Sequence, residues 1–276
     1  MRMIRGLAGP LPALFLFLVA VPVAAQEVLL PAQSTAKAKE LVQQTIEALG
    51  GAAYLNVKDA SCSGRLAQFT SQGELGGYVK IWDYSLLPDK NRTDYYDKRN
   101  IIEVHSGKDA WSLDRGGVTE MPVGEGETFL EGLKKDIDTL FRYRLKEDGM
   151  VFRYGGSDVV DLRPVDWVEV QDSDRRITRI AIDKATHLPL RALYITRDAE
   201  TRRRIEETAY FSNYFAVSGV QTPKQIARDR NGRKVFQVFW IDCQYNTNLL
   251  PSFFTRQALE EQFAKVGKKG KDNKKK

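Results

Sequence analysis

The sequence is poor in the side chains on which most enzymes and metal sites depend. Its 276 residues include only two histidines and two cysteines. His105 and His187 each lack a second histidine or a cysteine at ligand spacing, which argues against a zinc site. The HExxH, GxSxG and GxxxxGK[ST] motifs are absent. We therefore predict no catalytic residue, no metal and no cofactor; an exported hydrolase acting through one of these histidines is the remaining enzymatic alternative.

The sequence also lacks an apolar run long enough to cross a membrane. The longest, Leu11–Val23, is interrupted by prolines and falls short of the roughly twenty residues that a transmembrane helix needs. Arg2 and Arg5 precede it, and small residues follow it up to Ala25, which is the layout of a secretory signal peptide. We expect residues 1–25 to be cleaved after Ala25, leaving a periplasmic protein without a transmembrane segment.

Excess positive charge is missing from the part of the chain expected to fold. The formal net charge is +6, but residues 268–276, KKGKDNKKK, carry +5 of it and the signal peptide carries +2. The remaining chain is close to neutral, which argues against a nucleic-acid partner. We predict one domain over residues 26–266 and a disordered, lysine-rich tail over 267–276. A weak contact of this tail with anionic lipid or peptidoglycan is the alternative.

The two cysteines, Cys62 and Cys243, lie near opposite ends of the expected domain. Their separation excludes a CxxC redox or metal motif. Both occur in strand-like stretches, and an even number of cysteines in an exported protein favours a disulfide. The pattern predicts a Cys62–Cys243 bond, with two buried free thiols as the alternative.

Helical periodicity is confined to three stretches. Residues 34–49 place apolar side chains three and four positions apart, and a Gly-Gly pair follows them. The stripe that this helix should bury consists of Ala38, Leu41, Val42, Thr45, Ile46 and Leu49. A second helical pattern covers residues 127–147 and is bounded by Gly124, Gly126 and Gly149, so it is a candidate lid. A short third one begins near Ser252.

The rest of the chain alternates with the period of β-strands, and about eleven strands are expected. No linker rich in proline, glycine or serine occurs within residues 34–266. The fold class is therefore mainly β with helices (α+β), built on a single antiparallel sheet that is large enough to curl. In the stretch FSNYFAVSGVQTPKQI, residues 211–226, we expect one strand to end at Phe211 and a new strand to begin at Val220, with the residues between them as the connection. The arginines at 202–204 are interpreted as a solvated turn.

Apolar side chains on both faces of the longest strands suggest that both faces are covered. In the last strand, alternation assigns Val235, Phe239, Cys243 and their even-spaced neighbours to one face and Phe236, Val238 and Trp240 to the other. A curled sheet with a helix on one side and an internal cavity on the other would explain this pattern; closed core packing would explain it equally well. The candidate cavity-lining residues are Tyr78, Trp82, Tyr84, Trp111, Phe236, Phe239 and Trp240.

Several stretches taken together resemble a known family. They are EALGG at the end of the first helix, PDKNRTD, GKDAW, the segment from VEVQD through RITRIAIDKATHLPLR, and FSNYFAVSGVQTPKQI. Their order and spacing, over about residues 34–250, resemble the LolA-like or outer-membrane lipoprotein-sorting family of exported bacterial proteins.

This resemblance implies a half-open barrel of about eleven antiparallel strands, closed by an N-terminal and a central helix over an apolar interior. It implies a non-catalytic carrier or binder of the acyl chains of a lipid or lipoprotein. An envelope protein-interaction or stress-sensing module of the same fold is the alternative. The sequence departs from the family in its arginine-rich turns, its lysine tail and its two cysteines.

Overall fold

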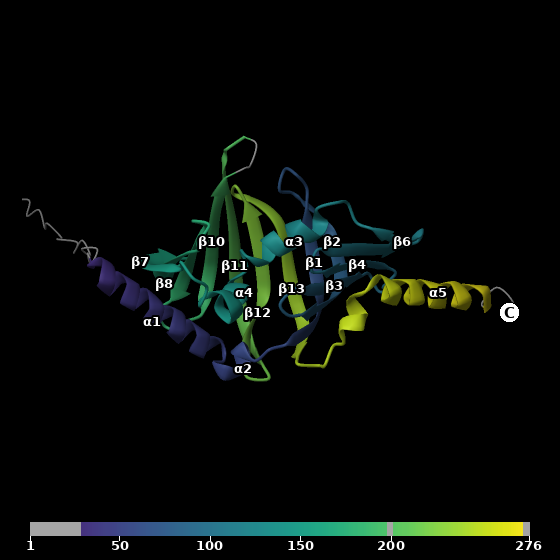
Figure 1. The fold of residues 1–276 in the computed structure, drawn as a ribbon, viewed down its shortest axis with the longest axis horizontal. Helices are drawn as coiled ribbons and strands as arrows, with labels where there is room; N and C mark the ends of the chain where they lie inside the picture. The colour runs from purple at the N-terminus through teal and green to yellow at the C-terminus, as the bar shows by residue number, and fades with distance from the viewer. Residues whose placement is uncertain (1–28, 198–200, 273–276) are drawn as a thin grey trace, which may run out of the picture.

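In the computed structural model, a single large antiparallel sheet curls around a group of short helices (Figure 1). The structure describes residues 29–197 and 201–272, so the predicted signal peptide lies outside the described residues. No helix in these ranges combines the length and the apolar character needed to span a membrane. The sheet has thirteen strands: β1 Asp59–Phe69, β2 Leu75–Leu86, β3 Lys90–Tyr95, β4 Ile101–Ser106, β5 Asp109–Asp114, β6 Gly117–Glu120, β7 Val151–Val160, β8 Arg163–Gln171, β9 Ile177–Asp183, β10 Pro189–Arg197, β11 Arg204–Val217, β12 Val220–Arg230 and β13 Arg233–Tyr245.

The strand order is that of two meanders joined at the centre. It runs β6-β5-β4-β3-β2-β1-β13-β12-β11-β10-β9-β8-β7, with β6 and β7 at the two edges. Every connection between successive strands is a local hairpin except one, in which the chain passes from one edge of the sheet to the other between β6 and β7. The pairing of β1 with β13 is the one that joins strands far apart in the sequence. The first and last strands therefore hold the two halves of the sheet together.

A disulfide joins these two central strands. Cys62 of β1 lies directly opposite Cys243 of β13 in the antiparallel register, and their sulfur atoms are bonded. This confirms the predicted pair. The sheet stays open, because β6 and β7 pair on one side only.

Helix α1, Pro31–Leu49, packs along the β7 edge of the sheet. Its buried residues are those of the predicted stripe, namely Ala38, Leu41, Val42, Thr45, Ile46 and Leu49. The helix begins three residues earlier than expected, because Pro31 occupies its first turn, where a missing N–H costs nothing. Ser34 and Thr35 hydrogen-bond the free backbone of β7: the Ser34 hydroxyl accepts from Tyr154 N–H, and the Thr35 hydroxyl donates to Phe152 O. Helix α1 thus covers an edge strand.

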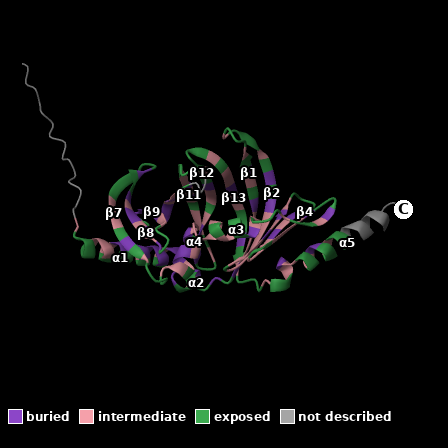
Figure 2. Ribbon diagram, turned by 45° about the horizontal axis from the view of Figure 1, so that its top comes forward, coloured by how far each residue is buried: buried purple, intermediate pink, exposed green. Residues whose placement is uncertain are grey.

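The connection between the two edges lies across the sheet, on the face that we call the inner face. It consists of α3 Glu125–Leu133, α4 Ile137–Thr139 and the π-helical turn η1 Leu140–Arg144. The sequence predicted one continuous helix over 127–147; the structure breaks it at 134–136, where Asp136 caps α4 by accepting a hydrogen bond from Thr139 N–H. Helix α1, the short α2 (Ala52–Leu55), α4 and η1 enclose the main core, as the buried colour in Figure 2 shows.

On the opposite, outer face, helices cover strands β3–β6, and a separate buried cluster around Val165, Ala181 and Leu190 lies over β7–β10. Over β3–β6, the 3-10 turn η2, Pro251–Phe254, and helix α5, Arg256–Asp272, bury a second core around Ile102, Val104 and Leu113. Helix α5 continues six residues into the predicted disordered tail, since lysine is a good helix former. Residues 273–276 of that tail lie outside the described residues.

Three further details differ from the sequence-based expectation. The sheet has thirteen strands rather than about eleven, because two-residue turns let even the short segments around β4–β6 form separate strands. Strand β11 continues through Val217, so only Ser218 and Gly219, both with positive φ, make the turn into β12. In β13 a bulge at Ile241 shifts the register, which moves Cys243 to the face of Trp240.

The disulfide generates the first prediction. Bonding two positions 181 residues apart restricts the unfolded chain, so Cys62→Ser/Cys243→Ser should lose up to about 5 kcal/mol of unfolding free energy on the chain-entropy model. Urea denaturation measures the loss, and the reduced wild-type protein is the matched control. An unchanged urea midpoint after complete reduction would contradict this role.

Candidate functional site

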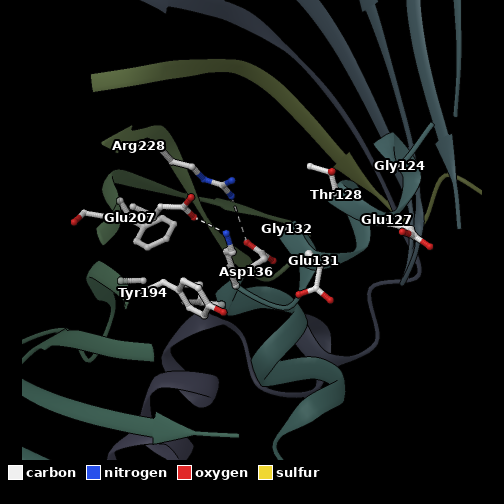
Figure 3. Close-up of a pocket in the computed structure, with 15 residues that line it drawn as sticks. Gly124, Glu127, Thr128, Glu131, Gly132, Asp136, Tyr194, Glu207 and Arg228 are labelled. Carbon is white, nitrogen blue, oxygen red and sulfur yellow. Dashed lines mark hydrogen bonds and ion pairs between the residues drawn. The ribbon is translucent and has the colours of Figure 1, made fainter. Parts of the chain in front are cut away.

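A cavity near the centre of the structure lies between residues 125–144, the crossing segment that connects β6 to β7, and strands β10–β12 (Figure 3). Its volume is about 600 Å³, which is within the range of small-molecule sites. Helix α3 and residues 135–137 form its roof, and the inner face of the sheet forms its floor. The lining residues are Gly124, Glu127, Thr128, Glu131, Gly132, Lys135, Asp136, Ile137, Ala192, Tyr194, Glu207, Thr208, Ala209, Phe211 and Arg228.

Two paired alanines create the hollow in the floor. Ala192 of β10 lies directly opposite Ala209 of β11, and their neighbours on the same face are Tyr194 and Phe211. Small side chains on adjacent strands leave space that larger ones would fill, because cross-strand pairs are in direct contact. Together with Ile137 in the roof, these residues make the interior of the cavity apolar and large enough for a hydrocarbon group.

Charged side chains surround the mouth and are paired across it. Lys135 Nζ lies 2.9 Å from Glu207 Oε2 and 5.1 Å from the centre of the Tyr194 ring. Arg228 lies 4.0 Å from Asp136. Both pairs join the crossing segment to the sheet. Burial raises the pKa of the Tyr194 hydroxyl, so this group stays neutral and can donate a hydrogen bond.

Asp136 is a partly buried acid at the mouth of this cavity. Burial raises the pKa of its carboxyl, the neighbouring Asp138 carboxylate raises it further, and Arg228 opposes the shift. Asp136, Ile137, Phe211 and Arg228 also line a smaller adjoining cavity. The Asp136–Arg228 pair therefore lies between the 600 Å³ cavity and this smaller one.

The crossing segment is anchored at both of its ends. At the start of α3, a Cβ on Gly126 would lie 1.9 Å from the Lys108 carbonyl oxygen in the β4–β5 turn, so only glycine fits this approach. At the end of η1, the Arg144 guanidinium lies 3.1 Å from the Asp172 carboxylate. Burial alone would raise the pKa of Asp172, but hydrogen bonds from Arg176 and Arg144 outweigh it and hold the pKa below its ordinary value. The middle of the segment, over the cavity, packs on the core through Ile137 and pairs with the sheet through Lys135–Glu207 and Asp136–Arg228.

Comparison with solved structures identifies the architecture. A DUF1329 family protein from Desulfovibrio piger has 15% identity and a TM-score of 0.57; the match covers 82% of this chain and 99% of the other. A putative outer membrane lipoprotein-sorting protein domain from Vibrio parahaemolyticus has 15% identity and a TM-score of 0.54, with the same coverage. The chain has a LolA-like fold. A LolA superfamily protein from Nitrosomonas europaea aligns with 12% identity, a TM-score of 0.49 and coverage of 80% and 99%. No family model and no curated protein matches the sequence.

The LolA-like fold distributes the seven aromatic candidates over both faces of the sheet. Phe236 and Trp240 lie on the inner face, in a cluster with Val79, Ile81 and Val238. Tyr84 and Trp111 pack against the outer core beneath η2 and α5. The other three also belong to the outer face: Tyr78, which is 62% exposed, Trp82, beneath the Arg99 guanidinium, and Phe239. The 600 Å³ cavity is lined by other residues.

The two histidines are not brought together. His105 lies on β4, where its ring stacks on Phe129 of α3 at 4.7 Å, and burial lowers its pKa. His187 lies in the β9–β10 turn, in the other half of the sheet. Within residues 29–197 and 201–272, no group of three or more His, Cys, Asp or Glu side chains is placed to hold a metal ion.

The residues missed by the sequence analysis are the small ones in the floor and the paired charges in the roof. An alanine inside an otherwise bulky strand, as in LPLRALYIT and RIEETAYFS, was a usable signal. Adjacent strands that each carry one indicate a hollow. The pairing of Lys135 and Arg228 with the sheet had no such signal, because it depends on where the crossing segment lies.

The pKa of Asp136 generates the second prediction. A carboxyl whose pKa is raised on folding reduces stability once the pH exceeds its ordinary value, near 4, because the folded state then resists ionisation. Asn caps a helix as well as Asp. Asp136→Asn should therefore raise the Tm at pH 7 by roughly 2 °C or more, with the gain vanishing near pH 3.

Thermal unfolding between pH 3 and 8 checks this. Asp148→Asn is the control, since Asp148 is an exposed carboxylate after η1. A lower Tm of Asp136→Asn at pH 7 would show that the charge stabilises the fold.

Proposed function

We propose that the protein is a periplasmic carrier or binder of acyl chains, belonging to a lipid or a lipoprotein, and that it is not an enzyme. The observation that carries the proposal is the 600 Å³ cavity on the inner face, floored by Ala192, Ala209 and Phe211. The LolA-like fold is consistent with it, and one structure with this fold is described as a putative outer membrane lipoprotein-sorting protein domain. Export rests on the signal peptide expected over residues 1–25.

Apolar side chains continue from the cavity along the inner face of the sheet. Ile226 packs against both the main core and the cluster of Val79, Val238 and their neighbours. The Arg228 guanidinium lies 5.2 Å from the centre of the Phe236 ring, at the boundary between the cavity and this cluster. A chain that enters the cavity and passes Arg228 would meet Phe236 and Trp240, the two aromatic candidates that remain on this face. Each methylene buried there contributes about 0.8 kcal/mol.

The charges at the mouth favour an uncharged group next to the chain. Four carboxylates line the cavity, Glu127, Glu131, Asp136 and Glu207, against the two cations Lys135 and Arg228, and both cations already have carboxylate partners. A free fatty-acid carboxylate would add another negative charge without a free cation. An ester- or amide-linked acyl chain avoids this repulsion, so we propose such a chain as the ligand.

Lipid extraction followed by mass spectrometry tests the proposal directly. Protein purified from a membrane-containing lysate should yield acyl material, and the emptied protein should bind a fluorescent diacylglycerol more tightly than the corresponding fatty acid. Protein that is repeatedly free of lipid and binds neither probe would refute the function.

Filling the hollow tests its location. Ala209→Leu places three extra carbon atoms in the cavity, which displaces about two methylenes of ligand and should weaken diacylglycerol binding about tenfold. Ala216→Leu is the matched control, because Ala216 is exposed on the same strand and does not line the cavity. Equal affinities of the two variants in a fluorescence titration would place the ligand elsewhere.

A further inference from the structure

A second cavity, which we call the rim cavity, lies at one end of the sheet, where three hairpin connections meet. Its volume is about 450 Å³. The connections β1–β2, β10–β11 and β12–β13 lie together at the top of Figure 1. The lining residues come from all three: Thr70, Ser71, Thr201, Arg203, Arg204, Ile205, Arg230, Asn231, Arg233, Lys234 and Val235.

The rim cavity is strongly cationic. Five of its lining residues are Arg or Lys. No aspartate or glutamate of the described part of the chain lines the cavity. Arg204 is paired with Glu206 at 2.8 Å, and Arg230 with Glu207 at 3.7 Å. The sequence of the β10–β11 connection includes Asp198 and Glu200, outside the described residues; even so, residues 197–204 hold four arginines against these two acids. The excess of positive charge is therefore local, in a body that is close to neutral.

The three hairpins are tied together without any ligand. The Arg233 guanidinium donates to the Ser71 carbonyl oxygen at 2.9 Å, which joins the β12–β13 turn to the β1–β2 turn. The Asn231 side-chain oxygen accepts a hydrogen bond from the Glu206 backbone N–H at 2.9 Å. The Asn231 backbone N–H donates to the Glu206 carbonyl oxygen at 2.7 Å. Because the backbone is fixed in this way, cations from separate turns stay close despite their repulsion. An anion that enters finds its partners already in place.

Exposed apolar side chains flank the same rim. Val235 lines the rim cavity and is 44% exposed; Leu75, on the β2 side of the neighbouring hairpin, is 50% exposed. Leu75 pairs with Phe69, and Lys234 lies over the Phe69 ring at 5.7 Å. A small soluble anion gives no reason for apolar groups beside the cations. A membrane surface accounts for both, because it presents anionic headgroups directly above hydrocarbon.

We propose that the rim cavity binds the phosphate group of an anionic phospholipid, with Val235 and Leu75 contacting the adjoining hydrocarbon, and so docks this end of the sheet on a membrane surface. Arginine side chains suit the role, since a guanidinium can donate two hydrogen bonds to one phosphate. The site is separate from the acyl-chain cavity, and its test does not depend on acyl binding.

Vesicle flotation tests the proposal with the whole protein. Binding should be strong to phosphatidylcholine vesicles that contain phosphatidylglycerol, absent with phosphatidylcholine alone, and weakened at 0.5 M salt. Arg203→Gln/Lys234→Gln removes two cations for which the described residues offer no carboxylate partner. It should lower the apparent affinity at least tenfold, since each cation near an anionic surface contributes on the order of a fivefold factor.

The matched control is Arg153→Gln/Lys146→Gln, which removes one exposed arginine and one exposed lysine far from the rim cavity. All three proteins keep the lysine-rich C-terminal tail, so its attraction to anionic vesicles cancels in the comparison. The control should bind like the wild type. An equal loss in both double variants would show that only overall charge matters, and would overturn the site.

Two further measurements decide the source of the phosphate. Val235→Ser changes no charge and should reduce vesicle binding severalfold while leaving any binding of inorganic phosphate unchanged. Binding of inorganic phosphate at the rim without binding to anionic vesicles would overturn the membrane assignment. Equal binding to neutral and anionic vesicles would overturn the role of the cations.

Discussion

The pairing of β1 with β13, locked by Cys62–Cys243, is the contact on which the rest of the structure depends. Each half of the sheet is a meander that uses only neighbouring segments. The two halves share no other strand pairing, because β6 and β7 are the opposite edges. The central pair therefore makes one curved surface from two smaller sheets. The inner face, including the apolar side chains from Ala209 to Trp240, is continuous only because this seam is closed.

The same topology produces the roof of the cavity. A chain that ends one meander at β6 and starts the next at β7 has to cross the width of the sheet. Lying across the inner face lets the connection bury Ile137, Leu140 and Phe141 against the core. Its ends are fixed at Gly126 and Arg144, whereas its middle packs on the core through Ile137 and is paired with the sheet through Lys135 and Glu207. The roof is thus a necessary connection that also closes the cavity.

Sequence periodicity predicted the elements that bury a regular stripe, and failed where tertiary contacts decide. The stripe of α1 was read correctly, as was the disulfide, because both depend on local pattern or on chemistry alone. Alternation already placed Phe239 on the opposite face from Phe236 and Trp240; it did not reveal that the cavity lies on the inner face, or that η2 and α5 cover Tyr84 and Trp111 on the outer face. The cavity is defined by two small residues, Ala192 and Ala209, whereas the candidates predicted from the sequence were large aromatic residues. The single helix expected in the roof is interrupted before Ile137, because Asp136 caps α4 instead of continuing α3.

The position of the disulfide also dictates an order of events. Strand β1 is made early, but its central partner follows 181 residues later. Until β13 is available, β1 can pair only with β2, and its other edge is an open template for wrong partners. Closing so long a loop is entropically costly and slow. A chain built in this way completes its architecture only after almost all of it is available to fold.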